Sequence, residues 1–162
     1  MTAMDASHPG PAPRGAGFSL PFLAGEGGLK ESRRRVARLL VWYNWAHVPV
    51  MSAVMLAIGG PALWVGGLSL LLCLLTEAVM RADRNLGRSA LAISLVGQAA
   101  LFVGGFAGHP WQVDTHMYFF AVLAFIGAMT DLRALLAGTG VLAVHHLSLN
   151  FAVPPLLFPG GA

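Results

Sequence analysis

Charged residues and cysteine are both scarce in this sequence. Only 10% of the 162 residues are charged, and the single cysteine, Cys73, lies inside an apolar stretch. One cysteine excludes a disulfide within the chain and a CxxC metal site, so we expect its thiol to behave as a small hydrophobic group. Hydrophobic residues make up 56% of the chain and the mean hydropathy is +0.69, which is typical of a membrane protein.

The N-terminal region lacks the continuous apolar core of about 7 to 15 residues that a signal peptide requires. Residues 1–28 are instead rich in Pro, Gly and Ala. We expect them to form a disordered cytoplasmic tail, because such a composition cannot bury a hydrophobic core. The remaining residues, 29–162, are expected to form one transmembrane helical domain.

Turn signals divide that domain into apolar blocks of about 20 residues, the length needed to cross a bilayer. The five expected membrane spans are residues 37–59, 61–80, 89–107, 112–130 and 132–153. The connections between them are short, so neighbouring helices must be adjacent and antiparallel. The sequence therefore predicts an all-α, polytopic membrane bundle.

Basic residues are confined to one side of these spans. All ten Lys and Arg residues lie before or at the start of the first span, between the second and third, or at the junction of the fourth and fifth. The positive-inside rule then places the N-terminus in the cytoplasm. Because orientation in the membrane accounts for these charges, no basic patch remains for nucleic acid, and we expect no nucleic-acid partner.

Histidines lie inside the predicted spans, where ionisable groups cost about 2.5 to 3.5 kcal/mol each. Counted from the outer ends of their spans, His116 lies about 7 Å deep and His145 and His146 about 12 to 14 Å deep. A neutral imidazole enters lipid more easily than a charge and is the commonest metal ligand. Because adjacent helical residues point about 100° apart, one metal centre can take only one of His145 and His146.

Three interpretations of this group remain open. The histidines could join helices by hydrogen bonds, with His109 and Asp114 in a water-facing loop. They could bind haem b or, as a weaker expectation, another metal ion, with His116 and either His145 or His146 as ligands and Asp114 as an outer partner. They could also sense or relay protons. The sequence has neither a CxxC nor an HExxH motif, and two ligands on facing helices suit haem better than a closed zinc site.

Other polar residues have supporting roles in these interpretations. We expect His47 to pack rather than to ligate a metal, and Asn44, Gln98 and Asn150 to donate hydrogen bonds between helices. Gln98 is also within reach of a cofactor in the expected bundle. Without an identifiable nucleophile, acid–base pair or open metal site, the sequence does not predict an enzyme.

Three segments, GHPWQVDTHMYFF, VHHLSLNF and FPGG, carry a resemblance to a known family. Over residues 97–162 the sequence resembles the membrane-embedded N-terminal region of bacterial methyl-accepting chemotaxis proteins, chiefly from alphaproteobacteria, and of relatives fused to other signalling outputs. In that family a further membrane helix and a cytoplasmic coiled-coil signalling domain follow, so the resemblance implies a sensory region truncated before that domain. The positions that match the motif are Trp111, Asp114, His116, His145, His146 and Asn150.

We therefore expect a multi-pass protein of the bacterial inner membrane that acts as the sensory input module of a chemotaxis or other signal-transduction receptor. Its expected partners are the lipid bilayer, a second copy of the chain, and a cytoplasmic signalling domain or partner in any longer form. One alternative is a small electron-transfer protein that binds haem through His116 and His145. Another is a structural or assembly subunit.

Overall fold

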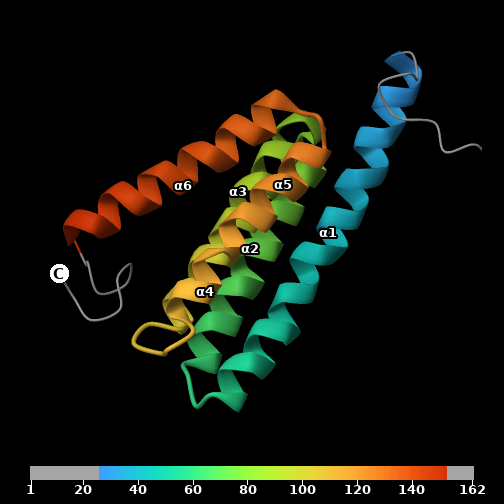
Figure 1. Ribbon diagram of the computed structural model, residues 1–162. Helices are drawn as coiled ribbons and strands as arrows, with labels where there is room; N and C mark the ends of the chain where they lie inside the picture. Colours follow the sequence, from blue (N-terminus) through green and yellow to red (C-terminus); the bar gives the residue numbers. More distant parts are fainter. Residues whose placement is uncertain (1–25, 153–162) are drawn as a thin grey trace, which may run out of the picture.

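Every element in the described part of the chain is a helix. The computed structural model describes residues 26–152, and the all-α prediction is confirmed over that range. The helices are α1 Glu26–Ala57, α2 Ala62–Ala82, α3 Arg84–Gly105, α4 Gln112–His116, α5 Tyr118–Ala128 and α6 Leu132–Ala152 (Figure 1). Within this range α1, α2, α3 and α6 are long and apolar enough to cross a membrane, which indicates a membrane protein.

The expected tail over residues 1–28 lies almost entirely outside the described residues. Its last three residues, 26–28, are helical and form the first turn of α1. The last residue of the expected fifth span, 153, is also outside the described range.

The expected span over residues 112–130 differs from the structure, so the count of five spans is not confirmed. It consists of two helices, α4 and α5, which meet at Met117. The backbone tightens there, because Met117 N–H donates to the Asp114 carbonyl and Phe120 N–H to the Met117 carbonyl, both at 3.1 Å. The Thr115 hydroxyl also donates to the Gln112 carbonyl at 2.8 Å and competes with the helical backbone for that acceptor.

Helix α3 is the centre of the bundle and contacts each of the other described helices. Half of its apolar window is buried, compared with 11% for α6. Figure 1 shows α1, α2, α3 and α5 running alongside one another, whereas α6 crosses at an angle to α3. The buried residues of α6, Ala134 and Gly138, lie in its first half, so the second half is loosely packed.

Two apolar clusters form the core. The smaller cluster joins α1, the start of α2 and the residue that follows α3, and it consists of Met51, Met55, Val65 and Phe106. The larger cluster joins α1, α3, α5 and the start of α6. Its buried members include Leu40, Leu91, Leu95, Val96, Ala99, Val103, Phe119, Val122, Ile126 and Met129.

The outside of the helices is also apolar. Leu63, Trp64 and Phe151 are 92%, 76% and 78% exposed in the isolated chain. A soluble monomer rarely leaves so many large apolar side chains in contact with water. Hydrocarbon is the environment that this surface fits, which agrees with the lengths of the four long helices.

Close contact between α2 and α3 depends on Gly87. A Cβ atom at this position would lie 2.7 Å from Met80 Cγ and 2.9 Å from Met80 Cα. We expect Gly87→Ala to lower the free energy of unfolding by about 1 to 3 kcal/mol, because the backbone of Met80 must shift. Gly104→Ala on the same helix is the matched control, since no atom lies within 4 Å of its added Cβ. Thermal unfolding in detergent, followed by circular dichroism, measures both; equal midpoints would contradict the prediction.

Asp131 joins α3 to the start of α6. Arg88 Nε donates to its Oδ2 at 2.5 Å, and the backbone N–H groups of Arg133 and Ala134 donate to its Oδ1 at 3.1 and 3.4 Å. Burial raises the pKa of this carboxyl, but the hydrogen bonds and the charge of Arg88 outweigh burial, and the pKa lies below its ordinary value. The carboxylate is thus a helix cap and an ion-pair partner at once.

This arrangement makes stability depend on acid pH. The pKa of Asp131 is lower in the folded state, so its stabilisation is complete above the ordinary carboxyl pKa of about 4 and is lost as pH falls through the folded value. We expect the thermal midpoint to fall on acidification below about pH 5. The fall should be smaller in Asp131→Asn, which keeps a capping oxygen without the charge. An unchanged pH profile in that variant would disprove the assignment.

Candidate functional site

The structure brings together the three histidines that the sequence singled out. The ring centroids of His116, at the end of α4, and His146, on α6, lie 6.1 Å apart. The rings of His145 and His146 are 5.4 Å apart. Phe119 packs against all three, with its centroid 6.0 Å from His116, 5.6 Å from His145 and 5.5 Å from His146. These three imidazoles are called the histidine cluster below.

Hydrogen bonds to the backbone define the tautomers of two of the rings. His116 Nδ1 lies 3.2 Å from the Gln112 carbonyl oxygen, and His146 Nδ1 lies 3.0 Å from that of Leu142. A carbonyl oxygen only accepts, so Nδ1 carries the proton in each ring. In the neutral rings Nε2 therefore keeps its lone pair, which is the form that binds a proton or a metal ion.

Two separate hollows adjoin the cluster. His116 and His146 line the first, of about 230 Å³, together with Met117, Phe119, Phe120, Leu123 and Leu142. His145 faces a second hollow of about 370 Å³ against α2 and α3. Its Nε2 is buried and has no hydrogen-bond partner within residues 26–152. The separation agrees with the expectation that adjacent helical histidines cannot serve one centre.

The donor set is small for a metal site. No group of three or more His, Cys, Asp or Glu side chains in residues 26–152 is placed to hold a metal ion. The expected outer partner, Asp114, is exposed in the first turn of α4. The Nδ1 atom of His116 instead donates to the carbonyl of Gln112.

Haem b fits this arrangement poorly. At about 230 Å³, the hollow that His116 and His146 line can hold a small ring but is below the range of about 300 to 1,000 Å³ that sites for drug-sized ligands occupy. Phe119 packs against both rings.

The remaining expected supporting residues lie apart from the cluster. His109 and Trp111 form a separate aromatic group with Phe106 after the end of α3, with centroids 5.2 Å (Phe106–His109) and 5.4 Å (His109–Trp111) apart. The backbone N–H of Trp111 donates to His109 Nδ1 at 3.2 Å. Asn150 is exposed one turn beyond His146.

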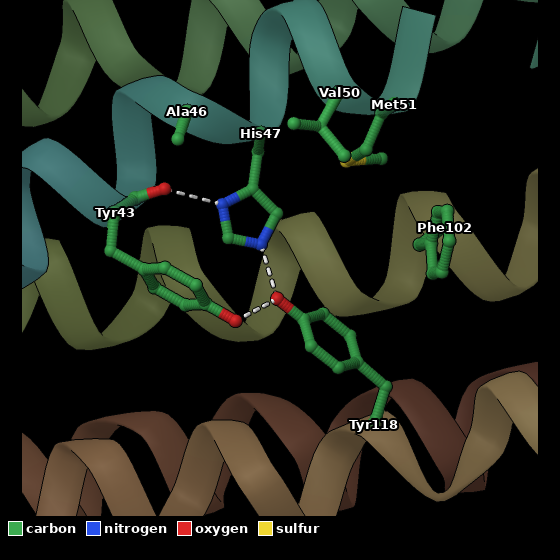
Figure 2. A pocket seen from close by; sticks show the side chains of 7 residues that line it. All are labelled: Tyr43, Ala46, His47, Val50, Met51, Phe102 and Tyr118. Carbon is green, nitrogen blue, oxygen red and sulfur yellow. Dashed lines mark hydrogen bonds between the residues drawn. The ribbon is translucent and has the colours of Figure 1, made fainter. Parts of the chain in front are cut away.

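His47 has polar partners, where the sequence predicted packing alone. It is buried on α1, and its Nδ1 lies 2.8 Å from the Tyr43 carbonyl oxygen. Its Nε2 lies 2.5 Å from the hydroxyl of Tyr118 on α5, and that hydroxyl is hydrogen-bonded to the hydroxyl of Tyr43 (Figure 2). The spacing of four residues between Tyr43 and His47 was a signal for one shared helix face. Nothing in the sequence placed Tyr118 opposite them.

A second polar group joins α1, α2 and α3 inside the bundle. Asn44 Nδ2 donates to Cys73 Sγ at 3.4 Å, and Ser94 Oγ donates to Asn44 Oδ1 at 3.0 Å. Gln98 Nε2 donates to the Ser69 carbonyl at 3.2 Å and to Cys73 Sγ at 3.5 Å. The interhelical role expected of Asn44 and Gln98 is confirmed. Cys73 is buried as expected, but it is also a hydrogen-bonding residue.

No protein-family model matches the chain, and no curated protein or solved structure matches it. The resemblance to chemotaxis receptors therefore stays a prediction that rests on the sequence segments alone.

Two leucine substitutions test the second polar group. Asn44→Leu leaves the buried Ser94 hydroxyl without its acceptor and removes the bond to Cys73, so we expect a loss of about 1 to 2 kcal/mol in unfolding free energy. Gln98→Leu should cost less, because Gln98 Oε1 is already buried without a partner in the described chain. Unfolding in mixed detergent micelles measures both. A larger cost for Gln98→Leu would contradict this account.

Proposed function

We propose that this chain is a membrane sensory input module of a bacterial signal-transduction receptor, and that its histidine cluster receives the stimulus as protons. One observation carries the proposal: imidazoles from α4 and α6 lie 6.1 Å apart where the second half of α6 is loosely packed. The resemblance to the chemotaxis receptors supports a sensory role. It also supports the inner membrane as the location.

Charge repulsion supplies the force for a conformational change. Two protonated imidazoles about 6 Å apart repel by about 3 kcal/mol at an effective dielectric constant of about 20. That energy changes an equilibrium about 100-fold, enough to convert a minor helix arrangement into the main one. Helix α6 is the element that yields, because so little of it is buried.

The surroundings of the cluster leave this repulsion uncompensated. The side chains that α5 and α6 add to the first hollow are apolar apart from His146. The second hollow is lined, besides His145, by apolar residues of α2 and α3. The carboxylate on α4, Asp114, is exposed. Protonation therefore adds like charges without adding a counter-charge.

A metal ion held by His116 and His146 is the second candidate stimulus. The supporting observation is that both Nδ1 atoms are occupied by backbone carbonyls, which leaves both Nε2 atoms as ligands. Imidazole nitrogens suit Zn²⁺, Cu²⁺ and Ni²⁺. Such an ion would pull α6 toward α4, the opposite of the movement that protonation produces.

The direction of movement tests the proposal. Spin labels on Val113→Cys and Val144→Cys, in a Cys73→Ser background, report the distance between α4 and the second half of α6. Both labelled positions are exposed. In lipid nanodiscs we expect the distance to increase on acidification, because protonation of both rings adds repulsion between α4 and α6.

Variants and controls show whether the histidine cluster causes the change in distance. His116→Gln together with His146→Gln should abolish the change, whereas His109→Gln, which lies outside the cluster, should leave it intact. A label on Leu136→Cys, in the first half of α6, should report no movement. A pH-independent distance in the unmodified cluster would refute proton sensing. A shorter distance on adding Zn²⁺ would favour the metal, and a haem absorption band lost in His116→Gln would favour the electron-transfer alternative.

A further inference from the structure

The hydrogen bonds around His47 have only one consistent direction when the ring is neutral. His47 Nδ1 faces a carbonyl oxygen, so Nδ1 carries the proton and Nε2 must accept. The group opposite Nε2 is the Tyr118 hydroxyl, which therefore donates to it. Because that proton is used, the Tyr43 hydroxyl donates to Tyr118. The chain of donors thus runs from Tyr43 through Tyr118 to His47.

With the hydrogen bonds in this direction, the group has free acceptor lone pairs but no free donor. The hydroxyl protons of Tyr43 and Tyr118 and the Nδ1 proton of His47 are all engaged within the group (Figure 2). Each phenol oxygen has two lone pairs, and the Tyr43 oxygen receives no hydrogen bond from residues 26–152 in this arrangement. In hydrocarbon an acceptor without a donor costs free energy that water would otherwise offset.

These oxygens border a hollow that is otherwise apolar. Its volume is about 210 Å³, and the walls besides the polar group are Ala46, Val50, Met51 and Phe102. A dry protein cavity of about 150 Å³ is large enough to bind benzene. Val50 is 56% exposed on the outer surface of α1, so a ligand can enter from the lipid.

We propose that this hollow binds the ring of a lipid-soluble phenol or quinol, whose hydroxyl donates to the phenol oxygen of Tyr43. The ring packs against Phe102 and Met51, and the hydroxyl supplies the donor that the group lacks. A quinone carries only carbonyl acceptors and has no donor to offer. This inference is independent of the histidine cluster, because it uses other residues and another ligand.

Protonation of His47 reverses the preference of the hollow for quinol over quinone. Nε2–H then donates to Tyr118, Tyr118 donates to Tyr43, and the Tyr43 hydroxyl is released to donate to a ligand carbonyl. Tyr43 on α1 and Tyr118 on α5 are the titratable groups that line the hollow beside His47, and α3 contributes Phe102. The site therefore favours the quinol when His47 is neutral and the quinone when it is charged.

Binding of three matched compounds tests this inference. A decyl-tailed benzoquinol, its quinone and its dimethyl ether share one ring and one tail, and calorimetry under anaerobic conditions measures each against the full chain in nanodiscs. At about pH 8, where imidazole is neutral, we expect the quinol to bind at least about tenfold more tightly than the ether or the quinone. Acidification that protonates His47 should narrow or reverse the preference for quinol over quinone.

Two variants separate the site from unspecific partition into lipid. Tyr43→Phe keeps the ring but removes the acceptor oxygen, and should abolish the preference for quinol over ether. Val50→Trp fills the entrance without touching a hydrogen bond, and should weaken all three compounds; Val144→Trp, exposed on α6, is its control. Equal affinities for quinol and ether, a quinol preference that survives Tyr43→Phe, or binding that Val50→Trp leaves unchanged would overturn the proposal.

Two further measurements identify the class of ligand and show whether this site is separate from the histidine cluster. If a decyl-tailed monophenol binds as tightly as the quinol, the site accepts phenols in general. If the monophenol binds more weakly, the site is specific for quinols. His146→Gln should leave quinol binding unchanged. Loss of the pH response of α6 in that variant, with quinol binding intact, would confirm that the two sites are separate. Loss of quinol binding in His146→Gln would contradict the placement around His47.

Discussion

Polar side chains inside hydrocarbon must find their hydrogen-bond partners within the protein, and this requirement organises the bundle. Asn44, Cys73 and Ser94 connect α1, α2 and α3 through their side chains. His47 and Tyr118 connect α1 to α5 in the same way. Apolar packing alone discriminates weakly between helix rotations in lipid, since lipid tails are as apolar as leucine. These polar contacts therefore specify which face of each helix is turned inward.

The site around His47 and the histidine cluster differ in how completely their polar atoms find partners within the protein. Around His47 each donor is satisfied by a neighbour, which leaves only acceptors available to a ligand. In the histidine cluster the Nδ1 atoms of His116 and His146 are satisfied by carbonyls one turn earlier, and His145 Nε2 is buried without a partner in the described chain. The first site thus presents only acceptors, and the second has an imidazole nitrogen without a partner on the least buried of the four long helices in the described chain.

Much of the fold could be predicted from the sequence, because apolar length and turn residues are local signals. Most of the helices could be inferred from the span boundaries, and the depths of His116, His145 and His146 placed them in the same half of the bilayer, but whether their rings meet could not be inferred. The break at Met117 could not, because the span boundaries do not show that the Thr115 and His116 side chains both bond to the Gln112 carbonyl there. The pairing of His47 with Tyr118 also could not, because helix rotation is decided by contacts between distant segments.

Helix α6 has 21 residues, so its length is about 31 Å, close to the thickness of the hydrocarbon layer. It crosses the bundle obliquely (Figure 1), and little of it is held by other helices. A thin bilayer favours greater tilt of such a helix, and a thick bilayer favours an upright one. A change in the tilt of α6 moves His146 relative to His116, which lies on α4. Membrane thickness, which varies with lipid saturation, thus affects the separation of the two rings in addition to any chemical signal.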